Sequence, residues 1–67
     1  MEDIKYPDVV APVIGTDGNA FALIGTVRAA LRLAGVPADE IEAFTEEATA
    51  GDYDHLLATI IKTVHVE

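Results

Sequence analysis

The side chains best suited to binding chemistry in this sequence are an aromatic ring and two arginines in one helical segment. Phe21, Arg28 and Arg32 are spaced at i, i+7 and i+11, which places them on one side of an α-helix. Arginine holds phosphate through a planar fork of donors, and an aromatic face can stack on a planar base. Half of the four lysines and arginines lie within this stretch. The pattern predicts a site for a nucleotide or another small phosphorylated ligand.

A turn with two glycines, residues 15–19, comes immediately before this helical segment. The first backbone N–H groups of a helix lack partners within the helix, and the helix dipole favours an anion beside them. Asn19 ends the turn and is suited to cap the helix. Tyr53 and His55, at the start of a later predicted helix, are also candidates. The predicted ligand-binding residues are therefore Asn19, Phe21, Arg28, Arg32, Tyr53 and His55.

The same residues also have a purely structural interpretation. In that case Phe21 packs in the core, and the two arginines pair with the carboxylates of neighbouring helices, as surface arginines often do. The sequence leaves both interpretations open.

Patterns of catalytic or metal-binding residues are absent from the sequence. Residues 17–19 match part of a calcium loop, but the terminal glutamate of an EF-hand does not follow. Asp52, Asp54 and His55 lie close together, yet a lone histidine needs a positioned nucleophile or a metal to do chemistry. Helix capping by Asp52 explains most of this group. We expect a non-enzymatic protein with no cofactor and no metal site.

The size and composition of the chain indicate one small domain that self-associates. Folding a chain of 67 residues buries only about 60% of its unfolded surface, which leaves the stability marginal. There is no cysteine to form a disulfide, yet 51% of the residues are hydrophobic. Self-association would cover the surplus apolar surface, and we therefore expect a homo-oligomer.

The charge of the chain restricts its partners. Four basic and twelve acidic residues give a formal net charge of −8, which repels DNA and RNA polymers. Charged residues interrupt the apolar stretches, and the N-terminus lacks the basic and apolar segments of a signal peptide. We expect no membrane association and a cytoplasmic location, which is the host cell cytoplasm if a phage encodes the chain.

The first predicted elements are an arm and a strand. Residues 1–7 are expected to form a flexible N-terminal arm, and residues 8–67 a single small domain. A β-branched run predicts a short strand over residues 8–14. Pro12 has no N–H group, which confines that strand to a sheet edge or a bulge.

Two helices are expected to follow the strand. The first is predicted over residues 20–34, because it is rich in alanine and leucine and Gly35 suits a left-handed C-terminal cap. Pro37 opens the second helix, which is predicted to close at Gly51.

A third helix and a second strand complete the predicted fold. Asp52 is placed to cap a helix over residues 53–63, and residues 64–67 can finish as a short strand. Pairing of the two strands gives a predominantly helical α+β domain of the order β-α-α-α-β.

The first predicted helix has two apolar sides. Its expected core side consists of Ala20, Leu23, Ile24, Val27, Leu31 and Ala34. The opposite side carries Phe21, Gly25, Arg28 and Arg32, flanked by Ala22, Ala29 and Leu33. A helix that is apolar nearly all round is normally covered on both sides. We therefore expect a second subunit or a ligand on that face.

Two motifs of the chain resemble a known family. The segments Gly15-Thr16-Asp17-Gly18-Asn19-Ala20-Phe21-Ala22 and Gly51-Asp52-Tyr53-Asp54-His55-Leu56-Leu57, with Val27-Arg28-Ala29-Ala30-Leu31 between them, look like a family of short, mostly uncharacterised bacterial and phage proteins. The resemblance extends from Val13 to Glu67. This family is similar to phage nucleotide sponges, the anti-CBASS proteins that evade host immunity by sequestering cyclic dinucleotides in oligomeric pockets. The resemblance transfers no ligand-binding residue to this chain.

Two functions are consistent with these patterns. In the first, the chain is an oligomeric protein that sequesters a small (cyclic) nucleotide signal between subunits. In the alternative, it is a protein–protein interaction module, whose face bearing Phe21, Gly25 and Leu33 docks another protein with the arginines at the rim.

Overall fold

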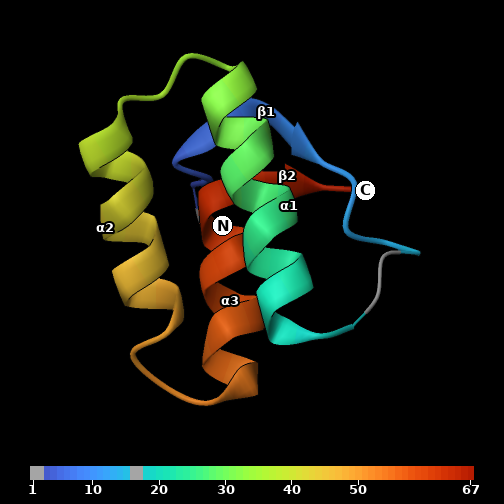
Figure 1. The fold of residues 1–67 in the computed structure, drawn as a ribbon. Helices are drawn as coiled ribbons and strands as arrows, with labels where there is room; N and C mark the ends of the chain where they lie inside the picture. The colour runs from blue at the N-terminus through green and yellow to red at the C-terminus, as the bar shows by residue number, and fades with distance from the viewer. Residues whose placement is uncertain (1–2, 16–17) are drawn as a thin grey trace.

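The structure of this protein is a computed structural model that describes residues 3–15 and 18–67. Its elements are β1 (Tyr6–Ala11), α1 (Ala20–Leu33), α2 (Ala38–Ala48), α3 (Tyr53–Thr63) and β2 (Val64–Val66). The three helices pack side by side, and the two strands lie together at one end of them (Figure 1). The predicted α+β fold of the order β-α-α-α-β is confirmed.

The two strands form a parallel pair. Tyr6 lies opposite Val64 and Ala11 opposite Val66, with an irregular register between Tyr6 and Val10. Parallel strands need a long crossover connection, which the three helices supply here. The short ladder leaves the outer edges of both strands unpaired among the described residues.

The bounds of β1 differ from those predicted. The strand begins at Tyr6, so Tyr6 and Pro7 belong to the sheet and not to an N-terminal arm. The backbone N–H of Lys5 donates to the carbonyl of Lys62, 2.9 Å away, which fixes this end of the strand. The strand stops at Ala11, because Pro12 cannot donate to a ladder. Residues 1 and 2 lie outside the described residues.

Most of the helix boundaries agree with the signals in the sequence. Gly35 has φ +86°, the left-handed conformation expected after α1, and its N–H donates to the carbonyl of Arg32. The side chain of Asp52 accepts a bond from the N–H of His55 at 2.9 Å and so caps α3. The second helix ends at Ala48, three residues before the predicted stop at Gly51.

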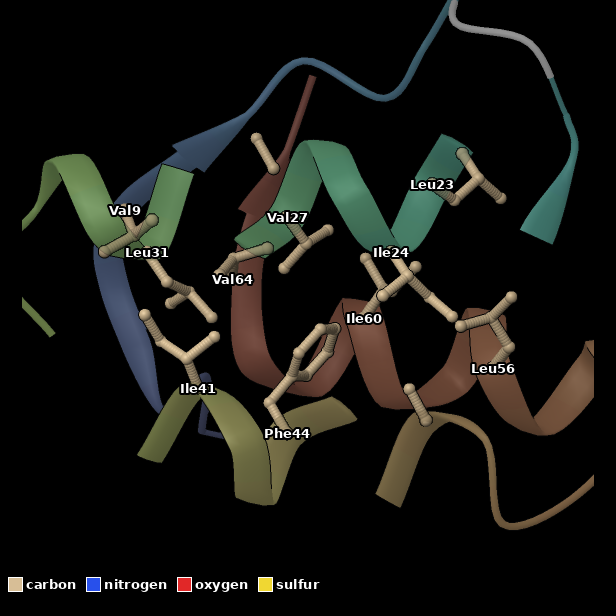
Figure 2. Packing of buried hydrophobic residues seen from close by; sticks show 12 residues of the cluster. Val9, Leu23, Ile24, Val27, Leu31, Ile41, Phe44, Leu56, Ile60 and Val64 are labelled. Carbon is tan, nitrogen blue, oxygen red and sulfur yellow. The ribbon is translucent and has the colours of Figure 1, made fainter. Parts of the chain in front are cut away.

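The core is formed where the inner faces of the three helices meet the sheet. Phe44 of α2 points between α1 and α3, toward Val27 and Ile60 (Figure 2). The buried apolar residues are Val9, Ala11, Leu23, Ile24, Val27, Leu31, Ile41, Phe44, Ala48, Leu56, Ile60 and Val64. The predicted core side of α1 is therefore correct for its four large residues. Ala34, which follows the last residue of α1, is exposed, so its predicted place in the core is wrong.

Tyr6 connects the sheet to α2. Its hydroxyl donates to a carboxylate oxygen of Glu40. This hydrogen bond, reinforced by burial and by the negative charges of Glu40 and Asp39, raises the pKa of Tyr6 from its usual value of 10.0 to about 12. The folded protein therefore keeps this phenol protonated to a higher pH than the unfolded chain does.

A pH dependence of stability follows from this tyrosine. As the pH rises, Tyr6 loses its proton at a lower pH in the unfolded chain than in the folded protein. Ionisation therefore stabilises the unfolded chain relative to the folded protein. We expect the free energy of unfolding to fall between about pH 10 and 12, and to fall less in Tyr6→Phe. Urea unfolding of both proteins across this range measures the difference. A parallel decline in the two proteins would show that Tyr6 contributes nothing.

Candidate functional site

The second face of α1 is exposed to solvent. Phe21 is 83% exposed and Leu33 is 89% exposed, at opposite ends of the helix. Gly25 and Ala29 lie exposed between them. The structural interpretation of Phe21 as a core residue is therefore wrong. This face remains available to a ligand or a second chain.

Phe21 lines a groove between the first turns of α1 and α3. The groove has a volume of about 260 Å³, and we call it the α1–α3 groove. Its lining residues are Ala20, Phe21, Ile24, Ala48, Thr49, Gly51, Asp52, Tyr53 and Leu56. Tyr53 is 45% exposed, so two accessible aromatic side chains border one hollow. Two of the six predicted ligand-binding residues are thus brought together.

Tyr53 and Asn19 fix the entry into α1. The Tyr53 hydroxyl donates to the carbonyl of Gly18 at 2.6 Å, which attaches Gly18 to α3. Residues 16 and 17 of the predicted turn lie outside the described residues. The side chain of Asn19 accepts from the N–H groups of Phe21 and Ala22 at 2.8 and 3.4 Å. Asn19 therefore acts as the helix cap, and it occupies two of the N–H groups that the sequence offered to a phosphate.

Arg28 is engaged within the chain. Its guanidinium donates to a carboxylate oxygen of Glu42 at 3.0 Å and to the hydroxyl of Thr45 at 2.7 Å, so it links α1 to α2. These contacts agree with the structural interpretation of Arg28, in which it pairs with a carboxylate of a neighbouring helix. Arg32 is exposed one turn further along, and its guanidinium makes no hydrogen bond or ion pair with any residue that the structure describes.

His55 lies behind the groove and not in its lining. Its Nε2 atom is 2.8 Å from the carbonyl oxygen of Glu47 and 2.9 Å from a carboxylate oxygen of the same residue. The imidazole also lies close to Gly51, where a Cβ atom would come within 2.9 Å of it. His55 thus holds the α2–α3 connection in place, and only glycine fits opposite it.

The sequence did not identify the polar lining of the α1–α3 groove. Thr49, Gly51 and Asp52 come from the connection between α2 and α3, which has no periodic pattern. Asp52 was recognised as a helix cap, and it holds that role here. The capping bond uses one carboxylate oxygen, so the other oxygen remains for a ligand donor.

A second groove was also missed. It has a volume of about 500 Å³ and runs between β1 and the outer side of α1. Val10 of β1 and Pro12, which follows the strand, line it on one side, and Ala29 and Leu33 of α1 on the other. This β1–α1 groove extends the exposed face of α1 toward the sheet.

Neither a group of potential metal ligands nor a membrane-spanning helix is found within residues 3–15 and 18–67. No three histidine, aspartate or glutamate side chains there are grouped as a metal site would need. No helix in the same residues is long and apolar enough to cross a membrane.

Comparison with known proteins finds no relative of this chain. No protein-family model, no curated protein and no solved structure matches it. The resemblance to small phage proteins stays a prediction, and any functional assignment depends on the groove itself.

Proposed function

We propose that this chain is a non-enzymatic, homo-oligomeric protein that sequesters a small nucleotide, with a base held in the α1–α3 groove. The observation that carries the proposal is the pair of exposed aromatic side chains, Phe21 and Tyr53, at one hollow. Stacking on aromatic side chains tolerates any base, because every base has a flat π-face. A groove bordered by two such rings favours a planar ligand.

The polar groups of the α1–α3 groove suit the edge of a base. Asp52 offers a carboxylate oxygen that can accept from an exocyclic amine. The Thr49 hydroxyl donates to the carbonyl of Thr45 at 2.8 Å, so it too can accept a bond from the base. The groove volume of about 260 Å³ lies just below the range of about 300–1,000 Å³ usual for small-molecule pockets. One subunit therefore has room for one base, and the rest of a cyclic dinucleotide extends outside it.

The phosphate is the difficult part of such a ligand. The chain has a net charge of −8, and Asp52 adds a carboxylate within the groove. Arg28 and the helix N–H groups capped by Asn19 already have partners. Arg32 is the arginine with a guanidinium left to bind phosphate, and it lies at the other end of α1 from the groove. Phosphate binding therefore requires an oligomer that brings an arginine to the groove.

Amide NMR spectra of the protein can test this proposal. The probes are cyclic di-AMP, cyclic di-GMP, cyclic GMP–AMP and the linear mononucleotides AMP and GMP. We expect at least one cyclic compound to shift the amide signals of Phe21, Gly51 and Tyr53. The signals of Asp39 and Ala43, exposed residues of α2 outside the groove lining, serve as an internal control and should not move. Unchanged spectra with every probe would contradict the proposal.

The alternative is a protein-interaction module, which one observation favours. Phe21 and Leu33 expose large apolar side chains at both ends of one helix face, and such surfaces are common at protein interfaces. If no nucleotide binds and Phe21→Asp abolishes the binding of a purified, identified protein partner, this second function replaces the first.

A further inference from the structure

Four exposed residues form a ridge along α1. Phe21, Gly25, Ala29 and Leu33 are spaced four residues apart, and rows with this spacing are the surface through which helices most often pack. The ridge is large at both ends and small in the middle. Along the sequence, the midpoint of the ridge is Val27, whose own side chain is buried in the core. The order of large, small, small and large residues is therefore the same from either end of the ridge.

We propose that a second copy of this chain docks antiparallel on this α1 ridge, and that its Arg32 completes the α1–α3 groove of the first copy. The second part of this inference rests on the proposed nucleotide binding, whereas the docking itself does not. The structure offers three supporting observations: the shape of the ridge, its charge and the position of Arg32.

The shape of the ridge suits two-fold symmetry. In an antiparallel pair centred on Val27, Gly25 of each copy faces Ala29 of the other, and each Phe21 faces the partner's Leu33. Small residues at the crossing point let the two helices approach to about 8–10 Å at the common crossing angle near −50°. Phe21 and Leu33 then lie on opposite sides of the crossing point. On each side, Phe21 of one copy covers Leu33 of the other. The same patch serves on both subunits, as a two-fold interface requires.

The charge distribution directs self-association to the same face. Each copy has a net charge of −8, so two copies repel each other over most approaches. The helix α1 contains none of the twelve acidic residues, whereas seven of them lie between residues 39 and 54. The α1 ridge is therefore a face where two copies meet without opposing carboxylates. An antiparallel arrangement also places the C-terminal end of α1, with Arg32, near the acidic start of the partner's α3.

The interface extends beyond the ridge. A stable dimer buries about 800 Å² on each partner, which is roughly a fifth of the 4320 Å² surface of this chain. One helix face is too small for that area. The β1–α1 groove continues the largely apolar surface from Leu33 to Val10, so it can contribute the remaining contacts, with the carboxylate of Asp8 in its lining.

The position of Arg32 follows from the same symmetry. In the antiparallel pair Arg32 lies opposite the partner's Ala22, next to the partner's Phe21. Phe21 borders the α1–α3 groove, so the guanidinium reaches the mouth of a groove that has aromatic rings and an acid but no cation of its own. A base in one subunit and its phosphate on an arginine of the other then form one site.

Substitutions in the middle of the ridge test the docking. A Cβ atom at Gly25 meets nothing within 4 Å in the single chain, so Gly25→Leu should fold. We expect wild type to sediment at twice the chain mass of 7.1 kDa at micromolar concentration. Gly25→Leu and Ala29→Leu should raise the dimer dissociation constant roughly 30-fold or more. Ala43→Leu, which adds the same volume as Ala29→Leu at an exposed position of α2, should remain dimeric.

Introduced cysteines test the orientation, because the chain contains no other thiol. A mixture of Gly25→Cys and Ala29→Cys proteins should give oxidised heterodimers, while each protein alone should give few covalent dimers. A monomeric wild type, or cross-linking of Gly25→Cys mainly to itself, would overturn the antiparallel docking.

A mixing experiment tests whether Arg32 acts across the interface. Arg32→Ala and Tyr53→Ala alone should each weaken the binding of cyclic di-AMP roughly 10-fold or more. Lys62→Ala removes the same charge from α3 and should bind as wild type does. In mixed dimers one groove keeps Tyr53 from one copy and Arg32 from the other, so mixing the two defective proteins should restore tight binding at one site per mixed dimer. Mixing without restoration would place Arg32 outside the partner's groove.

The failures of the two proposals can be told apart. A cross-linked antiparallel dimer that binds no nucleotide removes the nucleotide function and leaves the docking in place. Nucleotide binding by a monomer, with Arg32→Ala as tight as wild type, overturns the docking and leaves the groove.

Discussion

Replacement of Phe44 by alanine is expected to unfold a large fraction of the protein. Phe44 is only 6% exposed and lies between α1 and α3, where its ring contacts the centre of the core (Figure 2). Truncation of a buried phenylalanine costs about 3–5 kcal/mol, through lost burial and the cavity that remains. A chain of this length has a total stability of roughly 3–10 kcal/mol. The substitution therefore removes much or all of it.

Urea unfolding followed by circular dichroism measures this loss. The matched control is Ile61→Ala, because Ile61 is a large apolar residue of α3 that is 57% exposed. We expect the unfolding midpoint of Ile61→Ala to stay near that of wild type, while Phe44→Ala loses most of its helical signal even without urea. Equal midpoints for the two variants would contradict the packing described for α2.

Local signals in the sequence were sufficient for most of the helix boundaries, although α2 ends at Ala48 and not at Gly51. Gly35 ends α1 through its left-handed backbone conformation, and Asp52 begins α3 through its side-chain cap. Both effects act within a few residues along the chain, so the local sequence determines these boundaries. The start of β1 depends on a distant contact instead. Tyr6 binds Glu40, which is 34 residues away and gives no signal in the nearby sequence.

The candidate site was predictable only in part, for a similar reason. Helical spacing shows which side of α1 is exposed, and it correctly placed Phe21 and Arg32 there. It does not show which of the other helices packs next to each residue at the border of that exposed side. Arg28 lies at the edge next to α2 and pairs with Glu42, and His55 faces the end of α2 rather than the groove. These contacts arise from the packing of α2, which the pattern of α1 does not contain.

Removal of the Tyr53 ring is expected to have the largest effect on ligand binding. An aromatic side chain that stacks on a base contributes about 1–3 kcal/mol by alanine substitution, which weakens binding by roughly 5- to 150-fold. Tyr53→Ala also removes the hydrogen bond that attaches Gly18 to α3. Tyr53→Phe separates these effects, because it keeps the ring and loses only the hydroxyl. We expect Tyr53→Phe to bind within a few-fold of wild type.

Titration calorimetry of wild type, Tyr53→Phe and Tyr53→Ala with cyclic di-AMP, cyclic di-GMP and cyclic GMP–AMP tests the nucleotide-binding groove most directly. We predict a saturable heat for wild type with at least one of these compounds, similar binding by Tyr53→Phe and weaker binding by Tyr53→Ala in the range given above. A wild type that binds none of the three, or a Tyr53→Ala protein that binds as tightly as wild type, would contradict the assignment of the α1–α3 groove as a nucleotide site.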